Sequence, residues 1–165
     1  MKITKEKDAW AIAVIIVLTI LIMTTEILHW VRLSFLIGPL RLSHWLSWTG
    51  TIYIAFAVLI IALLKRRVPK KYQALTRLHI FGNLLAFMLI SLHFAGQISR
   101  TPLPDLGTGV ILYFAMVLLV GTGTLQKFHL VTRIKPRAFR FLHIGSAIVF
   151  YLIIVVHILH GIGLM

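Results

Sequence analysis

Four histidines form two pairs with the same internal spacing. His79 precedes His93 by fourteen residues, His143 precedes His157 by fourteen residues, and each pair lies inside a long apolar segment. At about 100° and about 1.5 Å per residue, this spacing returns a side chain to within about 40° of its starting face, about 21 Å further along an α-helix. Each pair is therefore predicted to place two imidazoles on one face of a helix, at two depths.

Imidazoles in this arrangement suit the axial ligation of haem. A single intramembrane histidine often serves as an interhelical hydrogen-bonding group or as part of a proton path. A single zinc or copper ion could not use all four, because the two levels are about 20 Å apart. A haem supplies four nitrogens itself and needs only two axial ligands. The sequence therefore predicts two b-type haems with bis-histidine ligation.

Composition places these histidines in a membrane protein. Of the 165 residues, 59% are hydrophobic and 13% are charged, whereas a soluble domain has about a quarter of its residues charged. Cysteine is absent, which excludes thiolate ligands, iron–sulfur clusters and covalent attachment of haem. The formal charge of +13 comes from short clusters between apolar runs, which is typical of juxtamembrane segments rather than of nucleic-acid binding.

We expect five membrane-spanning helices in a single membrane domain, residues 1–165. The first apolar run is longer than a signal-peptide core and has no small-residue cleavage site, so we expect it to be retained. Basic residues concentrate in the loops 65–77 and 127–140, which face the cytoplasm by the positive-inside rule. The chain is then a multi-pass protein of the cell membrane, with a cytoplasmic N-terminus and an external C-terminus. The apolar runs of about 20 residues cover about 9–31, 43–64, 76–98, 107–126 and 140–164.

This topology gives the two histidine pairs matching depths. The third and fifth spans run in the same direction, and the first histidine of each lies close to its cytoplasmic end. His79 and His143 are therefore predicted to share one haem at the inner level. His93 and His157 are predicted to share a second haem at the outer level.

Other histidines and one carboxylate are predicted to lie near the outer surface. His160 competes with His157 as a ligand, but it lies seventeen residues after His143, which rotates it about 100° from that face. His129 lies in a cytoplasmic loop. The outer polar residues line a proton exit, a quinone pocket or a substrate entrance, or they are ordinary polar residues of helix ends. They are Glu26, His29, His44 and His160.

Cations and glycines near the inner histidines are candidate haem contacts. Arg77 and Arg140 precede the inner ligands by two and three residues and would hold anionic propionates; alternatively, they only belong to the basic loops. Gly82 and Gly145 follow the inner ligands and would let a flat porphyrin press against the backbone. The alternative for both glycines is helix packing, for which small residues are enriched in membranes.

The ligand segments resemble a known family. Residues 77–97 contain Arg-Leu-His-Ile-Phe-Gly-Asn and then Ser-Leu-His-Phe-Ala-Gly. Together with residues 140–161, they resemble the transmembrane domain of ferric reductases and NADPH oxidases. The resemblance implies an outward path for electrons through two b haems, held by histidines of the third and fifth spans. The sequence departs from the family by stopping after the fifth span and by having no cytoplasmic flavin and nicotinamide domain, so we do not expect it to oxidise NADPH directly. The paired spacing also resembles the N-terminal four-helix part of respiratory cytochrome b.

We therefore expect an all-α five-helix bundle that holds two haems between its third and fifth spans and transfers electrons across the membrane. Filled axial positions favour outer-sphere transfer, and we assign no catalytic residues. The donor would be a cytoplasmic reductase or flavoprotein, or quinol, and the acceptor ferric iron, oxygen or a partner protein. Two alternatives are a quinone-reactive anchor subunit of a larger respiratory complex and a haem-free proton or metal transporter. The transporter needs a polar path, for which Asn83 is the clearest residue.

Overall fold

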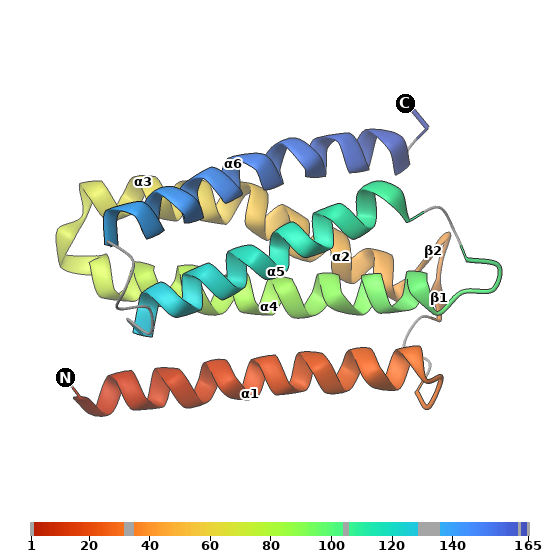
Figure 1. Ribbon diagram of the computed structural model, residues 1–165, viewed down its shortest axis with the longest axis horizontal. Helices are drawn as coiled ribbons and strands as arrows, with labels where there is room; N and C mark the ends of the chain where they lie inside the picture. Colours follow the sequence, from red (N-terminus) through yellow and green to blue (C-terminus); the bar gives the residue numbers. More distant parts are fainter. Residues whose placement is uncertain (1, 32–34, 104–105, 129–135, 162, 165) are drawn as a thin grey trace. The chain divides into compact units, whose positions relative to one another are not determined.

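The computed structural model describes residues 2–31, 35–103, 106–128, 136–161 and 163–164. The chain divides into two compact units, Met1–Pro104 and Asp105–Met165, and each is described by itself. The loop that contains His129 lies outside the described residues. The elements are, in order, α1 (Lys2–Ile27), β1 (Leu36–Ile37), β2 (Leu40–Arg41), α2 (Leu42–Ile52), the π-helical turn η1 (Tyr53–Ala57), α3 (Val58–Arg67), the 3-10 turn η2 (Pro69–Lys71), α4 (Tyr72–Ile98), α5 (Gly107–Phe128) and α6 (Pro136–Gly161) (Figure 1).

The part of the chain that the structure describes is helical apart from one short hairpin and its connections, as the five apolar runs predict. Five helices are long and apolar enough to cross a membrane, and they coincide with the five expected spans. The first of them ends at Ile27, earlier than the expected boundary near 31, and α4 begins at Tyr72, one turn earlier than expected. Within the second span, the π-helical turn η1 connects α2 to α3.

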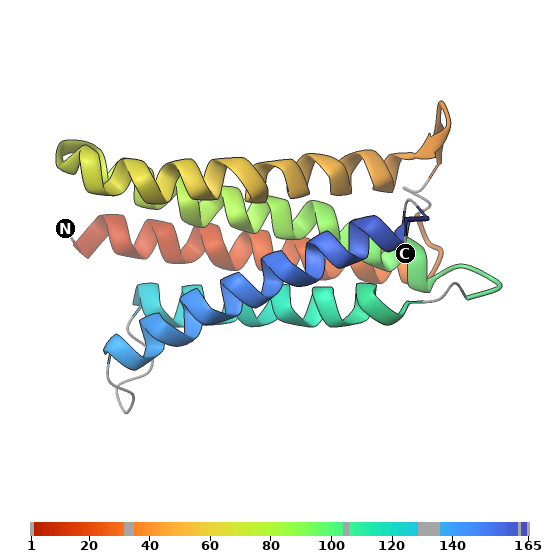
Figure 2. The ribbon, with the colours of Figure 1, turned by 90° about the horizontal axis from the view of Figure 1, so that it is seen from above.

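The first unit is built around α4, which contacts α1 on one side and α2 on another (Figure 2). The two helices α1 and α4 run in parallel, with their starts at the same end. Arg77 near the start of α4 is paired there with Asp8 near the start of α1, with Nε and Oδ1 3.5 Å apart. The segment α2–α3 runs antiparallel to α4. His44 at its beginning contacts His93 near the end of α4, and Tyr53 further along donates a hydrogen bond of 2.8 Å to the carbonyl oxygen of Leu78.

The π-helical turn positions Tyr53 against α4. A Cβ atom added at Gly82 would collide with the phenol ring of Tyr53, so the ring fills the space that a side chain at this position would need. A Cβ atom added at Gly50 would lie 3.1 Å from the carbonyl oxygen of Ala86. Glycine at both positions therefore lets α2 and η1 pack closely against α4, as small residues do between membrane helices.

The end of α1 and the hairpin lie at the same end of the first unit as the C-terminus of α4. α1 stops where His29 adopts a left-handed conformation, φ 57°. The hairpin turns through Gly38, φ 62°, and pairs Leu36 with Arg41. It is tied to α2 by the indole of Trp45, which donates a hydrogen bond of 3.1 Å to the carbonyl oxygen of Ile37. The sequence analysis did not anticipate this hairpin.

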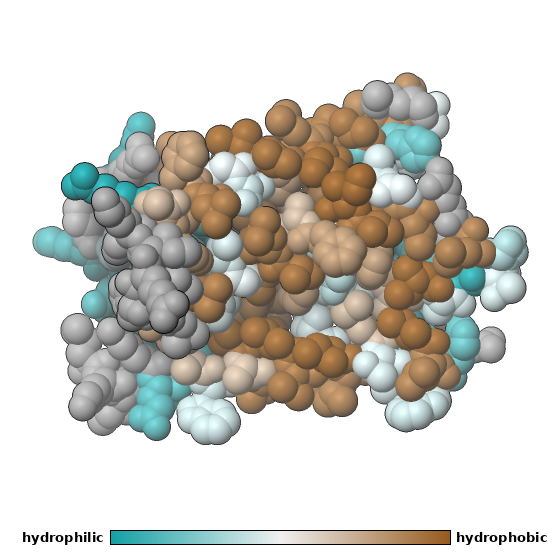
Figure 3. Space-filling view, viewed as in Figure 1, coloured by the Kyte–Doolittle hydropathy of each residue, from teal (hydrophilic) through white to brown (hydrophobic). Residues whose placement is uncertain are grey.

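The second unit consists of α5 and α6, which contact each other and run antiparallel. Large apolar side chains remain on the surface of these helices, for example Phe114, 67% exposed, and Leu152, 65% exposed. Hydrophobic residues, brown in Figure 3, also cover much of the visible surface along the helices. Soluble proteins rarely expose apolar surface on this scale, so these faces are suited to contact with lipid.

Replacing Gly82 with alanine is expected to destabilise the protein by about 1 to 3 kcal/mol, the usual cost of overpacking, because the added methyl group collides with Tyr53. The matched control is Gly121→Ala in α5, where no atom lies within 4 Å of the added Cβ. The control should lose no stability, since alanine favours helix more than glycine does. Thermal unfolding in detergent measures both, and equal midpoints for the two variants would contradict the packing assigned to Gly82.

Candidate functional site

Both histidine candidates of α6 face threonines of α5. Nδ1 of His143 lies 2.9 Å from Oγ1 of Thr122, and Nδ1 of His157 lies 3.0 Å from Oγ1 of Thr108. The two threonines are fourteen residues apart, as the two histidines are. Because α5 and α6 are antiparallel, each threonine meets one histidine, and the same contact is made twice.

The contact with Thr122 favours a proton on Nδ1 of His143. The Thr122 hydroxyl donates its hydrogen within its own helix, to the carbonyl oxygens of Leu118 at 2.8 Å and Leu119 at 3.1 Å. With that hydrogen donated within the helix, the hydroxyl oxygen is able to accept a hydrogen bond from Nδ1–H of His143. A neutral imidazole protonated at Nδ1 has its lone pair on Nε2, which is the nitrogen that could then bind a metal.

Glycine follows each of these threonines and lets the imidazole lie close to the backbone of α5. A Cβ atom added at Gly123 would be 3.3 Å from Cε1 of His143, and one at Gly109 would be 3.4 Å from Cε1 of His157. In the sequence, this feature is the tripeptide Gly-Thr-Gly, which occurs at 107–109 and again at 121–123. The sequence analysis missed this repeat, although its spacing equals that of the histidine pairs.

The two histidine candidates of α4 also have neighbours that orient them. The side-chain amide of Asn83 lies 3.5 Å from Nδ1 of His79, one helical turn away. The ring of His93 packs edge to face against the ring of His44, with centroids 4.8 Å apart. His44 is in turn 3.5 Å from the side-chain amide of Gln97, Nε2 to Nε2. Sequence analysis named His44 as an outer polar residue but did not connect it with His93.

The four candidate ligands divide between the two units. His79 and His93 belong to the first unit, and His143 and His157 belong to the second. Their pairing across the third and fifth spans therefore stays a prediction. Within α6, His157 is partly buried, whereas His160 is exposed, which favours His157 as the ligand. Within the described residues, no group of three or more His, Cys, Asp or Glu side chains could hold a bare metal ion.

The other predicted haem contacts have different surroundings. Gly82 makes room for Tyr53, so helix packing accounts for this glycine in the structure, whereas nothing lies within 4 Å of a Cβ added at Gly145. Arg77 forms the ion pair with Asp8, and Arg140 is exposed on the first turns of α6. The roles of these four residues toward a haem stay predictions.

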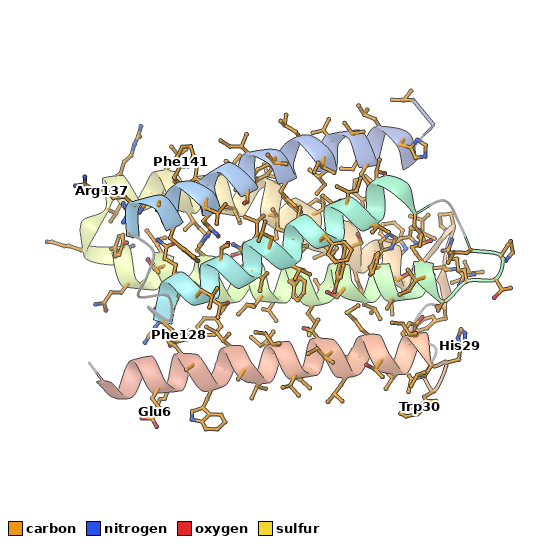
Figure 4. All side chains as sticks on the ribbon, viewed as in Figure 1. Glu6, His29, Trp30, Phe128, Arg137 and Phe141 are labelled. Carbon is orange, nitrogen blue, oxygen red and sulfur yellow. The ribbon has the colours of Figure 1, made fainter. Side chains whose placement is uncertain are left out.

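Two of the outer polar residues line a common pocket. Glu26 and His29, at the end of α1, face a pocket of about 510 Å³ together with Arg41 of the hairpin and Arg100, which follows α4. His29 and Trp30 are labelled at this end of α1 in Figure 4. The sequence predicts Glu26 and His29 together near the outer surface, but it does not predict that either arginine lines a pocket with them.

Comparison of the chain with known proteins found no match among family models, curated proteins or solved structures.

Replacing Thr122 with valine should destabilise the protein by about 1 to 3 kcal/mol, the cost of leaving a desolvated polar group without its hydrogen-bond partner, because the partly buried ring of His143 loses its contact with the hydroxyl. Thr122→Ser keeps the hydroxyl and should retain most of the stability. Thr124→Val, one position past the Gly-Thr-Gly repeat, serves as the control. Denaturant unfolding in detergent distinguishes the three, and a Thr122→Val variant as stable as the control would argue against the hydrogen bond.

Proposed function

We propose that this protein is a di-haem b-type cytochrome that carries electrons across a membrane. His79 and His143 would ligate one haem near the cytoplasmic side, and His93 and His157 would ligate a second haem near the outer side. Five helices are long and apolar enough to hold such a site within a bilayer. The proposal differs from a quinone-reactive anchor in needing no larger complex to move electrons across the bilayer.

One observation carries the proposal: on α6, two histidines fourteen residues apart each present Nδ1 to a threonine hydroxyl of α5. Histidines that bind metals almost always donate their other ring N–H to a neighbouring acceptor, which fixes the tautomer and the orientation of the ring. An ordinary interhelical hydrogen bond would not need to recur at an equal interval on both helices. Two ligands at two depths, each oriented by its own threonine, would produce this recurrence.

The glycines of the Gly-Thr-Gly repeat add to this support. The second glycine of each repeat, Gly109 and Gly123, brings the backbone of α5 within van der Waals reach of one imidazole, so rotation of the ring is restricted on that side. A ligand whose rotamer is locked by packing and by hydrogen bonding holds its metal more reproducibly. Thr122 and Thr108 are therefore positioning residues in this proposal, and His143 and His157 are the ligands.

Bound haem would supply one-electron chemistry, with a potential set by its axial ligands, by hydrogen bonds to those ligands and by burial. The chain's own residues would hold each haem with two histidines, orient the imidazoles and exclude water with apolar helices. With two histidines holding each haem, the group would supply electron transfer between sites rather than reaction at the metal.

The charge distribution suggests where partners would dock. Basic residues concentrate in residues 65–77 and 127–140, which the positive-inside rule assigns to the cytoplasm. An acidic face of a reductase or flavoprotein would be attracted to them, while quinol would reach the site from the lipid. The protein would lie in the cell membrane with its N-terminus in the cytoplasm. The electron acceptor would then be on the outer side, as ferric iron, oxygen or a partner protein.

The proposal predicts about two haems per chain by the pyridine haemochrome assay and electron transfer across a sealed membrane. Protein reconstituted into liposomes that contain ferricyanide should oxidise dithionite added outside, whereas liposomes without protein should not. Purified protein that lacks haem, or haem-loaded protein that transfers no electrons across the membrane, would contradict the function.

A matched pair of variants in α6 sharpens the same experiment. His157→Ala should lose one haem and abolish transfer across the membrane, because the outer level would lack an axial ligand. His160→Ala removes an exposed histidine three residues away and should retain both haems. The opposite result would show that His160 is the outer ligand of α6.

A further inference from the structure

The pocket at the C-terminal end of α1 brings together charged residues from three separate parts of the first unit. Glu26 and His29 come from the end of α1, Arg41 from the hairpin, and Ser99, Arg100 and Thr101 from the segment after α4. Its volume is about 510 Å³, within the range of about 300 to 1,000 Å³ typical of sites for small organic ligands. Neither the predicted haem ligands nor the threonines of α5 line it.

Positive charge dominates this pocket. Among the described residues that line it, two guanidinium groups accompany one carboxylate, that of Glu26, which is only 4% exposed. Arg100 is partly buried, and within the described residues its Nε is a buried donor without a hydrogen-bond partner. Burial and the neighbouring charge of Arg41 lower the pKa of Arg100. Two like charges held near each other repel, and a further anion bound between the two guanidinium groups would reduce that repulsion.

The available donors suit an oxyanion. A guanidinium group binds the two oxygens of a carboxylate or phosphate through parallel N–H donors. The hydroxyl of Thr101 is a further donor on the same wall. A single inorganic ion would fill only a small part of the pocket, so the oxyanion is expected to belong to a larger molecule.

We propose that this pocket binds an organic molecule through a phosphate or carboxylate group held by Arg41 and Arg100. Two sources offer this chemistry. The pocket lies at the ends of α1 and α4, where the exposed aromatic residues Trp30 and Trp45 are suited to the headgroup level of a membrane. A phospholipid headgroup could therefore enter from the bilayer, and a soluble organic anion could enter from the water. The site needs no haem, so it goes beyond the proposed electron transfer.

The test uses the complete purified protein in phosphate-free neutral detergent. Native mass spectrometry with added phosphatidylglycerol measures lipid binding, and thermal unfolding with added citrate or inorganic phosphate measures binding of soluble anions. Arg100→Gln and Arg41→Gln should each weaken binding by about ten- to a hundredfold, the contribution of a charge-assisted hydrogen bond. The control is Arg137→Gln, an exposed arginine at the start of α6 (Figure 4), which should bind as the wild type does.

The outcomes distinguish the sources. Loss of the phosphatidylglycerol adduct in both pocket variants, with no effect of soluble anions, supports a lipid headgroup. Stabilisation by citrate or phosphate that disappears in both variants supports a soluble anion. Binding that is equal in the wild type, the pocket variants and Arg137→Gln, or that is absent from the wild type, overturns the proposal. Because Arg41 is exposed, its variant is expected to fold even if Arg100→Gln does not.

Discussion

A spacing of fourteen residues on a membrane helix is the constraint on which the account depends. It returns side chains to one face and separates them by about 21 Å, enough for two sites at two depths. In the second unit this interval occurs on both helices, in the histidines of α6 and in the Gly-Thr-Gly repeat of α5. Since the helices are antiparallel, a single packing register satisfies both contacts. A one-residue change in spacing on either helix would break one of them.

The first unit meets a different requirement, which is to hold α4 in place from several sides. Tyr53, presented by a π-helical turn, fits into the space left by Gly82, and Asp8 of α1 pairs with Arg77 at the start of α4. At the other end, His44 packs against His93. Such turns inside α-helices are frequently found at functional sites. Here the turn sets the position of an aromatic side chain that keeps α2 and α4 in register.

Local patterns predict the five spans and the fourteen-residue spacing of the histidines: runs of apolar residues predict the spans, and the period of an α-helix relates the histidines. Within α5 the repeat at Thr108 and Thr122 was equally local and could have been found by asking which helix shares the interval of the histidines. The π-helical turn at Tyr53 could not be found in this way, because it differs from a regular helix only in its hydrogen bonding. Sequence patterns also do not predict that Glu26, Arg41 and Arg100 line one pocket, because this depends on how α1, the hairpin and α4 pack together.

The central claim is that each haem joins α4 to α6, and electron paramagnetic resonance of the oxidised protein tests it most directly. Two low-spin ferric signals are expected from the wild type, one for each bis-histidine haem. Alanine at His79 or at His143 should remove the same signal, and alanine at His93 or at His157 should remove the other. If the two histidines of one helix, such as His79 and His93, instead control the same signal, the proposed pairing is contradicted.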